Sequence, residues 1–120
     1  MSNSKSAIDL KDVLERVQDD TELLVELLDI FLEDYKEKHK LLEELITHKD
    51  FEQIRNVAHS LKGAAGNISA TDFHRSFSAM EQFGDESNLD GINKMMLKLE
   101  EDFPKLQRSI EEIKAKYNTG

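Results

Sequence analysis

The segment from Val57 to Ser69, with the sequence V-A-H-S-L-K-G-A-A-G-N-I-S, is the part of the chain around which the other elements are arranged. Its apolar residues, together with Phe51 and Ile54 just before it, recur three and four positions apart. On a helix that turns about 100° per residue, such spacings return to one face. By the same angular step, His59 lies roughly 140° from the middle of that apolar stripe. We therefore predict an amphipathic helix that buries the stripe and turns His59 toward solvent.

Two glycines, Gly63 and Gly66, share the solvent side of this helix with Lys62. Each glycine destabilises a helix by about 1 kcal/mol relative to alanine. The presence of two glycines therefore indicates that space is needed around His59. Two other interpretations stay open here. A surface histidine with basic neighbours is common in helical proteins, and Gly63 could be a simple C-cap with Lys62 in the last turn. The apolar period continues to Ile68, which favours a helix that runs past both glycines.

The run from His59 to Ile68 resembles the phosphorylation-site motif of histidine-containing phosphotransfer (HPt) domains of multistep two-component relays. The match is contiguous, and the surrounding helix pattern extends the resemblance from about Ile8 to Tyr117. The family commonly has glycine after the Asn-Ile pair, where this chain has Ser69. That difference concerns the turn at the end of the motif rather than His59.

Composition limits the possible classes of protein. A chain of 120 residues suits one domain and can bury a single core without metal or disulfide help. One proline, five glycines and 38% hydrophobic residues fit an all-helical protein. The absence of cysteine excludes a disulfide framework, zinc-thiolate sites and cysteine nucleophiles, and suits a reducing compartment.

Charge and hydropathy exclude two kinds of partner. With 25 acidic and 16 basic side chains, the net charge of -9 disfavours nucleic acid and anionic membrane surfaces. No apolar run approaches the roughly 18 to 20 residues needed to span a bilayer. Residues 1–7 lack the hydrophobic segment of a secretory signal. We expect a cytoplasmic protein.

Apolar periodicity predicts five helices. A polar lead-in, residues 1–7, precedes a short helix of about two turns that Asp9 caps. A long helix is expected from about Asp20 to Thr47, opened by a capping box of Asp19 and Glu22.

The later helices complete the predicted bundle. The third helix is capped by Asp50, and the fourth runs from Ala70 or Thr71 to Phe83. The last helix carries an apolar heptad: Ile92, Met96, Leu99, Phe103, Leu106, Ile110, Ile113 and Tyr117. Because the stripe resumes in phase after Pro104, we predict a kink near 100–104 and no break. The pattern favours an all-α, up-and-down antiparallel four-helix bundle over residues 8–117, with the short first helix as a lid and residues 118–120 as a tail.

The remaining polar residues give little functional signal. The charged run from Lys36 to Lys40 is interpreted as a solvated face. His39, His48 and His74 lie on different elements without H-x-x-x-H spacing, so no metal site is expected. Nothing resembles a P-loop or a kinase glycine-rich loop. We therefore expect no ATP site and no cofactor of the chain's own, and a phosphoryl group that arrives from another protein.

Phosphoryl transfer through histidine needs an accessible ring nitrogen, a nearby cation and room for the donor. The resemblance implies that His59 is the phosphoacceptor, with Nε2 as the attacking atom. Lys62 lies on the neighbouring turn and is the best candidate to neutralise the phosphoryl oxygens. Gly63 and Gly66 leave the flank of the imidazole free of side chains.

Two further residues are candidates for the site. The family often places Glu or Gln on the next helix to hold the other ring nitrogen, and Glu81 stands at that point. By this resemblance Glu81 would orient the imidazole; alternatively it is a surface acid paired with Arg55 or Lys62. Arg55 either adds positive charge to the site or pairs with Glu52 or another carboxylate, and both interpretations stay open.

The resemblance implies a phosphorelay intermediate. His59 would take a phosphoryl group from the aspartyl phosphate of one response-regulator receiver domain and pass it to another. The receiver would supply Mg²⁺ and dock on the surface formed by the second and third helices around His59. The expected partners are receiver domains, including that of a hybrid sensor kinase, and the chain is expected to be a monomer. The alternatives are a non-catalytic helical adaptor that binds and inhibits a receiver or histidine kinase, and a module of a larger hybrid kinase.

Overall fold

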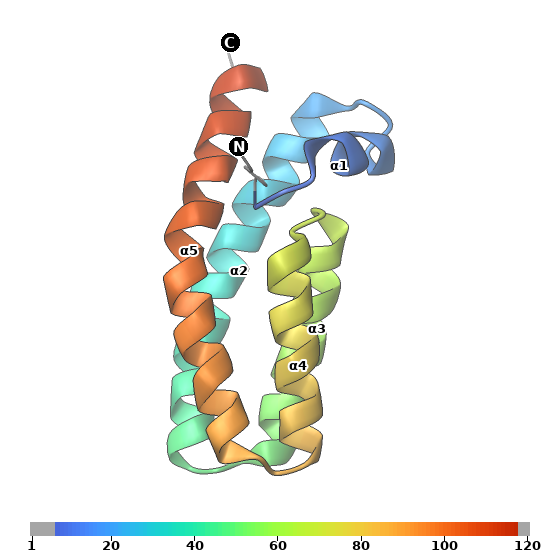
Figure 1. Ribbon diagram of the computed structural model, residues 1–120. Helices are drawn as coiled ribbons and strands as arrows, with labels where there is room; N and C mark the ends of the chain where they lie inside the picture. Colours follow the sequence, from blue (N-terminus) through green and yellow to red (C-terminus); the bar gives the residue numbers. More distant parts are fainter. Residues whose placement is uncertain (1–6, 118–120) are drawn as a thin grey trace, which may run out of the picture.

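The computed structural model describes residues 7–117, which form five helices joined by short turns (Figure 1). They are α1 (Leu10–Arg16), α2 (Thr21–Thr47), α3 (Phe51–Asn67), α4 (Thr71–Asp85) and α5 (Leu89–Tyr117). The described part of the chain contains no strand, so the all-α prediction is confirmed. The predicted lead-in, apart from Ala7, and the predicted tail lie outside the described residues.

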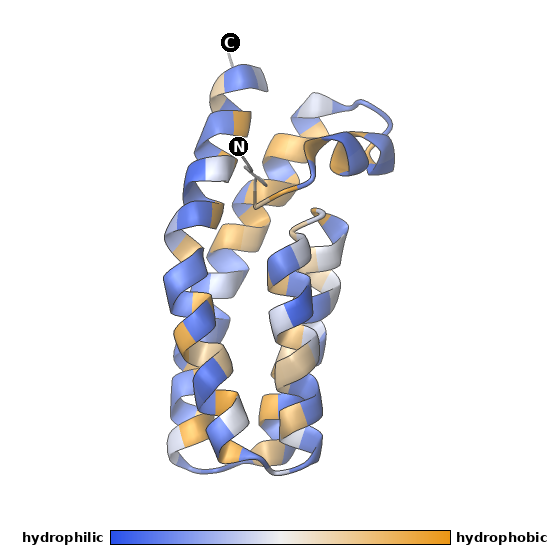
Figure 2. Cartoon of the chain, in the orientation of Figure 1, coloured by the Kyte–Doolittle hydropathy of each residue, from blue (hydrophilic) through white to orange (hydrophobic). Residues whose placement is uncertain are grey.

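The helices α2 to α5 lie side by side, and consecutive ones run in opposite directions (Figure 1). They pack in ring order, since α2 contacts α3, α3 contacts α4, α4 contacts α5, and α5 returns to α2. The short helix α1 lies across one end and contacts α2. Figure 2 shows hydrophobic residues concentrated on the part of α2 beside α1, whereas hydrophilic residues cover most of the visible surface of α5.

An aromatic cluster fills the middle of the core. The rings come from three helices and are those of Phe31, Tyr35, Phe73, Phe77 and Phe103. Tyr35 lies at the centre, with its ring centroid 4.9 Å from that of Phe103 on α5. The cluster therefore joins α2, α4 and α5.

Aspartate side chains cap three of the helices. Asp9, Asp20 and Asp50 each accept a hydrogen bond from the backbone N–H three residues later, at 3.0 to 3.2 Å. The caps of α1 and α3 were predicted correctly. The cap of α2 was placed one residue too early: Asp19 adopts a left-handed backbone with φ of 62°, and Asp20 accepts the hydrogen bond instead.

The helix α5 continues through Pro104. The prediction that proline does not break the helix is confirmed, and the kink stays a prediction. The apolar heptad lies against the other helices, with Ile92, Leu99, Leu106 and Ile110 fully buried. None of the helices within residues 7–117 is long and apolar enough to cross a membrane.

Ser69 occupies the turn position where the resembled family commonly has glycine. Its backbone is left-handed, with φ of 57°, a conformation that favours glycine. Its side chain is buried, and its hydroxyl donates a 2.6 Å hydrogen bond to the Asp12 carboxylate of α1. The Ser69 carbonyl also accepts a bond from the Asp9 N–H. Serine therefore ties α1 to the α3–α4 turn, which glycine could not do with a side chain.

Candidate functional site

The helix α3 presents His59 to solvent. On the apolar stripe of the same helix, Ala58 and Leu61 are completely buried, whereas 67% of the His59 side chain is exposed. The helix continues past Gly63 and Gly66 to Asn67, so Gly63 is not a C-cap. The predicted orientation of His59 is confirmed.

Glu81 of α4 holds two side chains of α3 at once. Its Oε2 lies 2.9 Å from His59 Nδ1, and its Oε1 lies 2.7 Å from Lys62 Nζ. A carboxylate accepts hydrogen bonds, so it holds the proton of a neutral imidazole on Nδ1. Nε2 is then left with a free lone pair on the exposed part of the ring.

The Lys62 ammonium favours the ionised form of Glu81. Its hydrogen bond is the main reason that the pKa of Glu81 lies below its usual value of 4.5, and the bond from His59 lowers the pKa further. Partial burial of Glu81 acts in the opposite direction. Glu81 therefore makes both of the contacts considered for it, one with Lys62 and one with the imidazole, and its role in orienting the ring stays a prediction.

The glycines of α3 have different surroundings. A Cβ built at Gly63 would have no neighbouring side chain and no backbone of another helix within 4 Å. Nothing in the fold therefore requires glycine at this position. A Cβ at Gly66 would lie 3.4 Å from the His74 ring, which partly covers this turn. The open flank beside His59 is therefore at Gly63, and it extends less toward Gly66 than predicted.

Two other glycines serve the packing of the helices. A Cβ at Gly84 would lie 3.2 Å from the backbone of α3, and a Cβ at Gly91 would come within 2.6 Å of the Phe83 ring. Gly91 therefore leaves no room for a side chain and Gly84 leaves little, in contrast to Gly63.

Arg55 lies one turn before His59 on α3. It lines a surface depression of about 320 Å³ together with Glu81 and Asp85. Within residues 7–117 its guanidinium forms no hydrogen bond or ion pair, and the proposed pair with Glu52 is not observed. Its positive charge thus remains available beside Glu81.

The sequence interpretation missed the position of Lys38. This lysine lies in the run interpreted as a solvated face, yet its ammonium donates to the Ser60 hydroxyl of α3 at 2.9 Å. Ser60 is adjacent to His59, so Lys38 adds a cation on the α2 side of the histidine. The apolar stripe of α2 between Tyr35 and Leu42 could have located it, since Lys38 is three residues from Tyr35 and four from Leu42.

The comparison with protein families agrees with this geometry. The profile of the Hpt domain family matches residues 26–116, which include α3, α4 and most of α2 and α5. No curated protein and no solved structure shows a significant match to the chain. Hpt domains are phosphotransfer intermediates of two-component phosphorelays rather than classical enzymes. With a match over more than half of its length, the chain belongs to the Hpt domain family.

Proposed function

We propose that His59 accepts a phosphoryl group from the aspartyl phosphate of one receiver domain and transfers it to the aspartate of another. The observation that carries this proposal is the hydrogen bond between His59 Nδ1 and Glu81, because it leaves Nε2 as a free nucleophile on an exposed ring. Glu81 is a positioning residue in this scheme.

The transfer forms one bond and breaks one. Nε2 attacks the phosphorus of the acyl phosphate, and the P–O bond to the donor aspartate breaks as its carboxylate leaves with the electron pair. The Nδ1 proton stays between the ring and Glu81, which stabilises the positive charge that the ring gains on phosphorylation. The second transfer is the reverse reaction with a different receiver aspartate.

Positive charge beside His59 would balance the phosphoryl oxygens. Lys62 is half-buried and bonded to Glu81, so its ammonium is held within one helical turn of the imidazole. Arg55 lies one turn before His59 on α3, and the Lys38 ammonium of α2 donates to the neighbouring Ser60 hydroxyl. We propose that Lys62 contacts the phosphoryl group directly, that Arg55 is an accessory cation, and that Mg²⁺ comes with the receiver domain.

Receiver docking is proposed on the surface of α2 and α3 around His59. The open space at Gly63 supports this surface, because the fold itself makes no use of that space. We also propose a monomeric, cytoplasmic four-helix-bundle module. Most of the apolar stripe of α5 is buried within its own chain, which supports a monomer.

The proposal is tested by incubating the protein with receiver domains that carry ³²P-labelled aspartyl phosphate. Transfer to His59 gives a label on this protein that is labile in acid and stable in alkali. His59→Gln should abolish the label, whereas His48→Gln and His74→Gln, which change other exposed histidines, should keep it. Label that persists in folded His59→Gln, as judged by circular dichroism, would disprove the assignment.

The adaptor alternative predicts a different result in the same experiment. An adaptor would bind the receiver and inhibit its output without taking a label. Binding and full inhibition by His59→Ala, with no label on the wild-type protein from any receiver of the host, would favour that alternative.

A further inference from the structure

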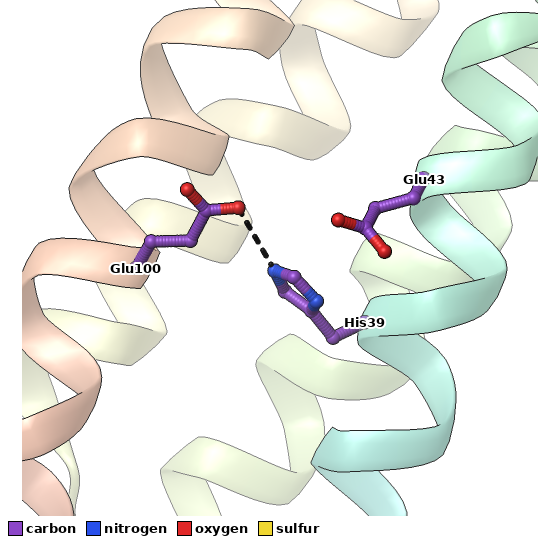
Figure 3. A group of neighbouring side chains, drawn as sticks. All are labelled: His39, Glu43 and Glu100. Atoms are coloured by element: carbon purple, nitrogen blue, oxygen red, sulfur yellow. Dashed lines mark ion pairs between the residues drawn. The ribbon is translucent and has the colours of Figure 1, made fainter.

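Three potential metal ligands meet between α2 and α5, away from His59 (Figure 3). His39 and Glu43 lie one turn apart on α2, and Glu100 approaches them from α5. One ligand atom from each lies within 4.8 Å of the other two. His39 Nε2 and Glu100 Oε2 are 3.3 Å apart. The sequence interpretation considered H-x-x-x-H spacing alone and so overlooked this H-x-x-x-E pair with its partner on another helix.

Two buried polar atoms at this place lack hydrogen-bond partners among the described residues. One is His39 Nε2, because the Glu100 carboxylate approaches it without the alignment of a hydrogen bond. The other is the hydroxyl of Tyr35, a side chain that is only 3% exposed. A buried polar group without a partner costs about 1 to 3 kcal/mol. Two such groups side by side indicate a binding site for a polar ligand.

A cavity of about 480 Å³ joins these groups. Its lining comprises Tyr35, Lys36, His39, Lys40, Glu43, Glu100, Phe103 and Pro104. Because proline has no N–H, the backbone carbonyl of Glu100 also lacks its helical donor four residues later. The cavity is therefore bordered by acceptor atoms from both helices and by the Tyr35 hydroxyl.

We propose that this cavity binds Zn²⁺ through His39 Nε2 and the carboxylates of Glu43 and Glu100, with the Tyr35 hydroxyl donating to a water molecule in the fourth position. Two ligands that each lie about 2.0 to 2.1 Å from a tetrahedral zinc are roughly 3.3 Å apart. The His39–Glu100 pair already has that separation. Glu43 is exposed and free to change rotamer, so it can close the third position.

The surroundings favour zinc over magnesium or calcium. Lys36 and Lys40 on the rim of the cavity oppose the charge of the two carboxylates, so charge alone binds a cation weakly here. Zn²⁺ gains from the imidazole nitrogen, which Mg²⁺ and Ca²⁺ do not prefer. The Tyr35 hydroxyl has no other partner among the described residues and lines the same cavity, so it can donate to the water in the fourth position.

Titration of the metal-free protein with Zn²⁺ at pH 7, followed by calorimetry, tests the site. We expect saturable binding of one ion per chain, with Mg²⁺ giving no binding under the same conditions. His39→Gln and Glu100→Gln should each weaken binding roughly tenfold or more. His48→Gln, just beyond the C-terminal end of α2, and Glu101→Gln, next to Glu100, are matched controls that should leave the affinity unchanged. Zn²⁺ should also raise the Tm of the wild-type protein and not that of His39→Gln.

Tyr35→Phe separates the proposed site from simple packing. It should weaken Zn²⁺ binding about tenfold without lowering the Tm of the metal-free protein, because it removes a buried hydroxyl that has no partner. Absence of saturable Zn²⁺ binding to the wild-type chain would overturn the proposal. Binding that survives His39→Gln, or that is lost in His48→Gln, would overturn it as well. These residues are separate from those around His59, so neither result depends on the phosphotransfer proposal.

Discussion

Replacing Gly63 with alanine should make the protein more stable and a poorer phosphotransfer partner. Gly63 lies inside α3, and a Cβ there would meet nothing within 4 Å. Glycine in a helix is less stable than alanine by about 0.5 to 1 kcal/mol. With no clash to offset this difference, Gly63→Ala should raise the free energy of unfolding by about that amount. For a domain of this size, the gain corresponds to a Tm increase of about 2 to 4 °C.

The same methyl group should hinder the partner. A helical side chain covers the surface over the turn that precedes it, so a side chain at position 63 would lie toward His59, four residues earlier. A misplacement of about 1 Å between reacting groups costs on the order of 100-fold in rate. We expect Gly63→Ala to slow phosphotransfer from a receiver roughly tenfold or more, and Gly63→Leu to abolish it.

Two measurements on one preparation decide the matter: urea unfolding followed by circular dichroism, and the rate at which label passes from the phosphorylated receiver. Gly66→Ala is the control one turn later, where the new methyl group would lie against His74 rather than in the open flank. It should slow transfer less than Gly63→Ala. A Gly63→Ala protein that is more stable and transfers at the wild-type rate would refute the steric reasoning.

Substitutions at three further positions give defined outcomes. Glu81→Gln should lower the stability of the fold at neutral pH. The pKa of Glu81 is depressed in the folded state. The contribution of the Glu81 carboxylate to the free energy of unfolding is therefore fully present above the usual pKa of 4.5 and is lost as the pH falls through the lowered pKa. The difference in unfolding free energy from wild type should therefore narrow below pH 4.5, and a difference that is constant from pH 7 to pH 3 would contradict this. Gly84→Ala should destabilise the fold by about 1 to 3 kcal/mol in urea unfolding, because its Cβ would press on the α3 backbone. Ser69→Gly and Ser69→Ala both lose the hydrogen bond to Asp12, but only alanine keeps a Cβ at positive φ. The alanine variant should therefore be less stable than the glycine variant by roughly 1 kcal/mol in urea unfolding. Equal stabilities of the two variants would show that the backbone of this turn is unstrained.

The helices and the exposure of His59 could be predicted because they depend on local periodicity. The stripe through Val57, Leu61 and Ala65 fixes which face of α3 is buried, and His59 is then exposed by rotation alone. The N-cap of α2 was predicted one residue too early because Asp19 and Asp20 are both residues that cap helices well. The backbone of the preceding turn decides between the two.

Contacts between helices could be predicted only in part. The family resemblance identified Glu81, but its simultaneous bonds to His59 and Lys62 depend on how α4 packs against α3. The neighbours of Lys38 and Gly66 depend in the same way on the next helix. Helical periodicity gives the face on which a side chain lies and leaves open what the facing helix places opposite it.

The phosphotransfer proposal predicts which atom of the protein carries the phosphoryl group. Protein labelled with ¹⁵N, after phosphorylation by a receiver domain in alkaline buffer, allows ³¹P–¹⁵N couplings to identify the modified ring nitrogen. We predict a single phosphohistidine at His59, bonded through Nε2, with Nδ1 still protonated against Glu81. Phosphorus on Nδ1 of His59, or on any other side chain, would contradict the account.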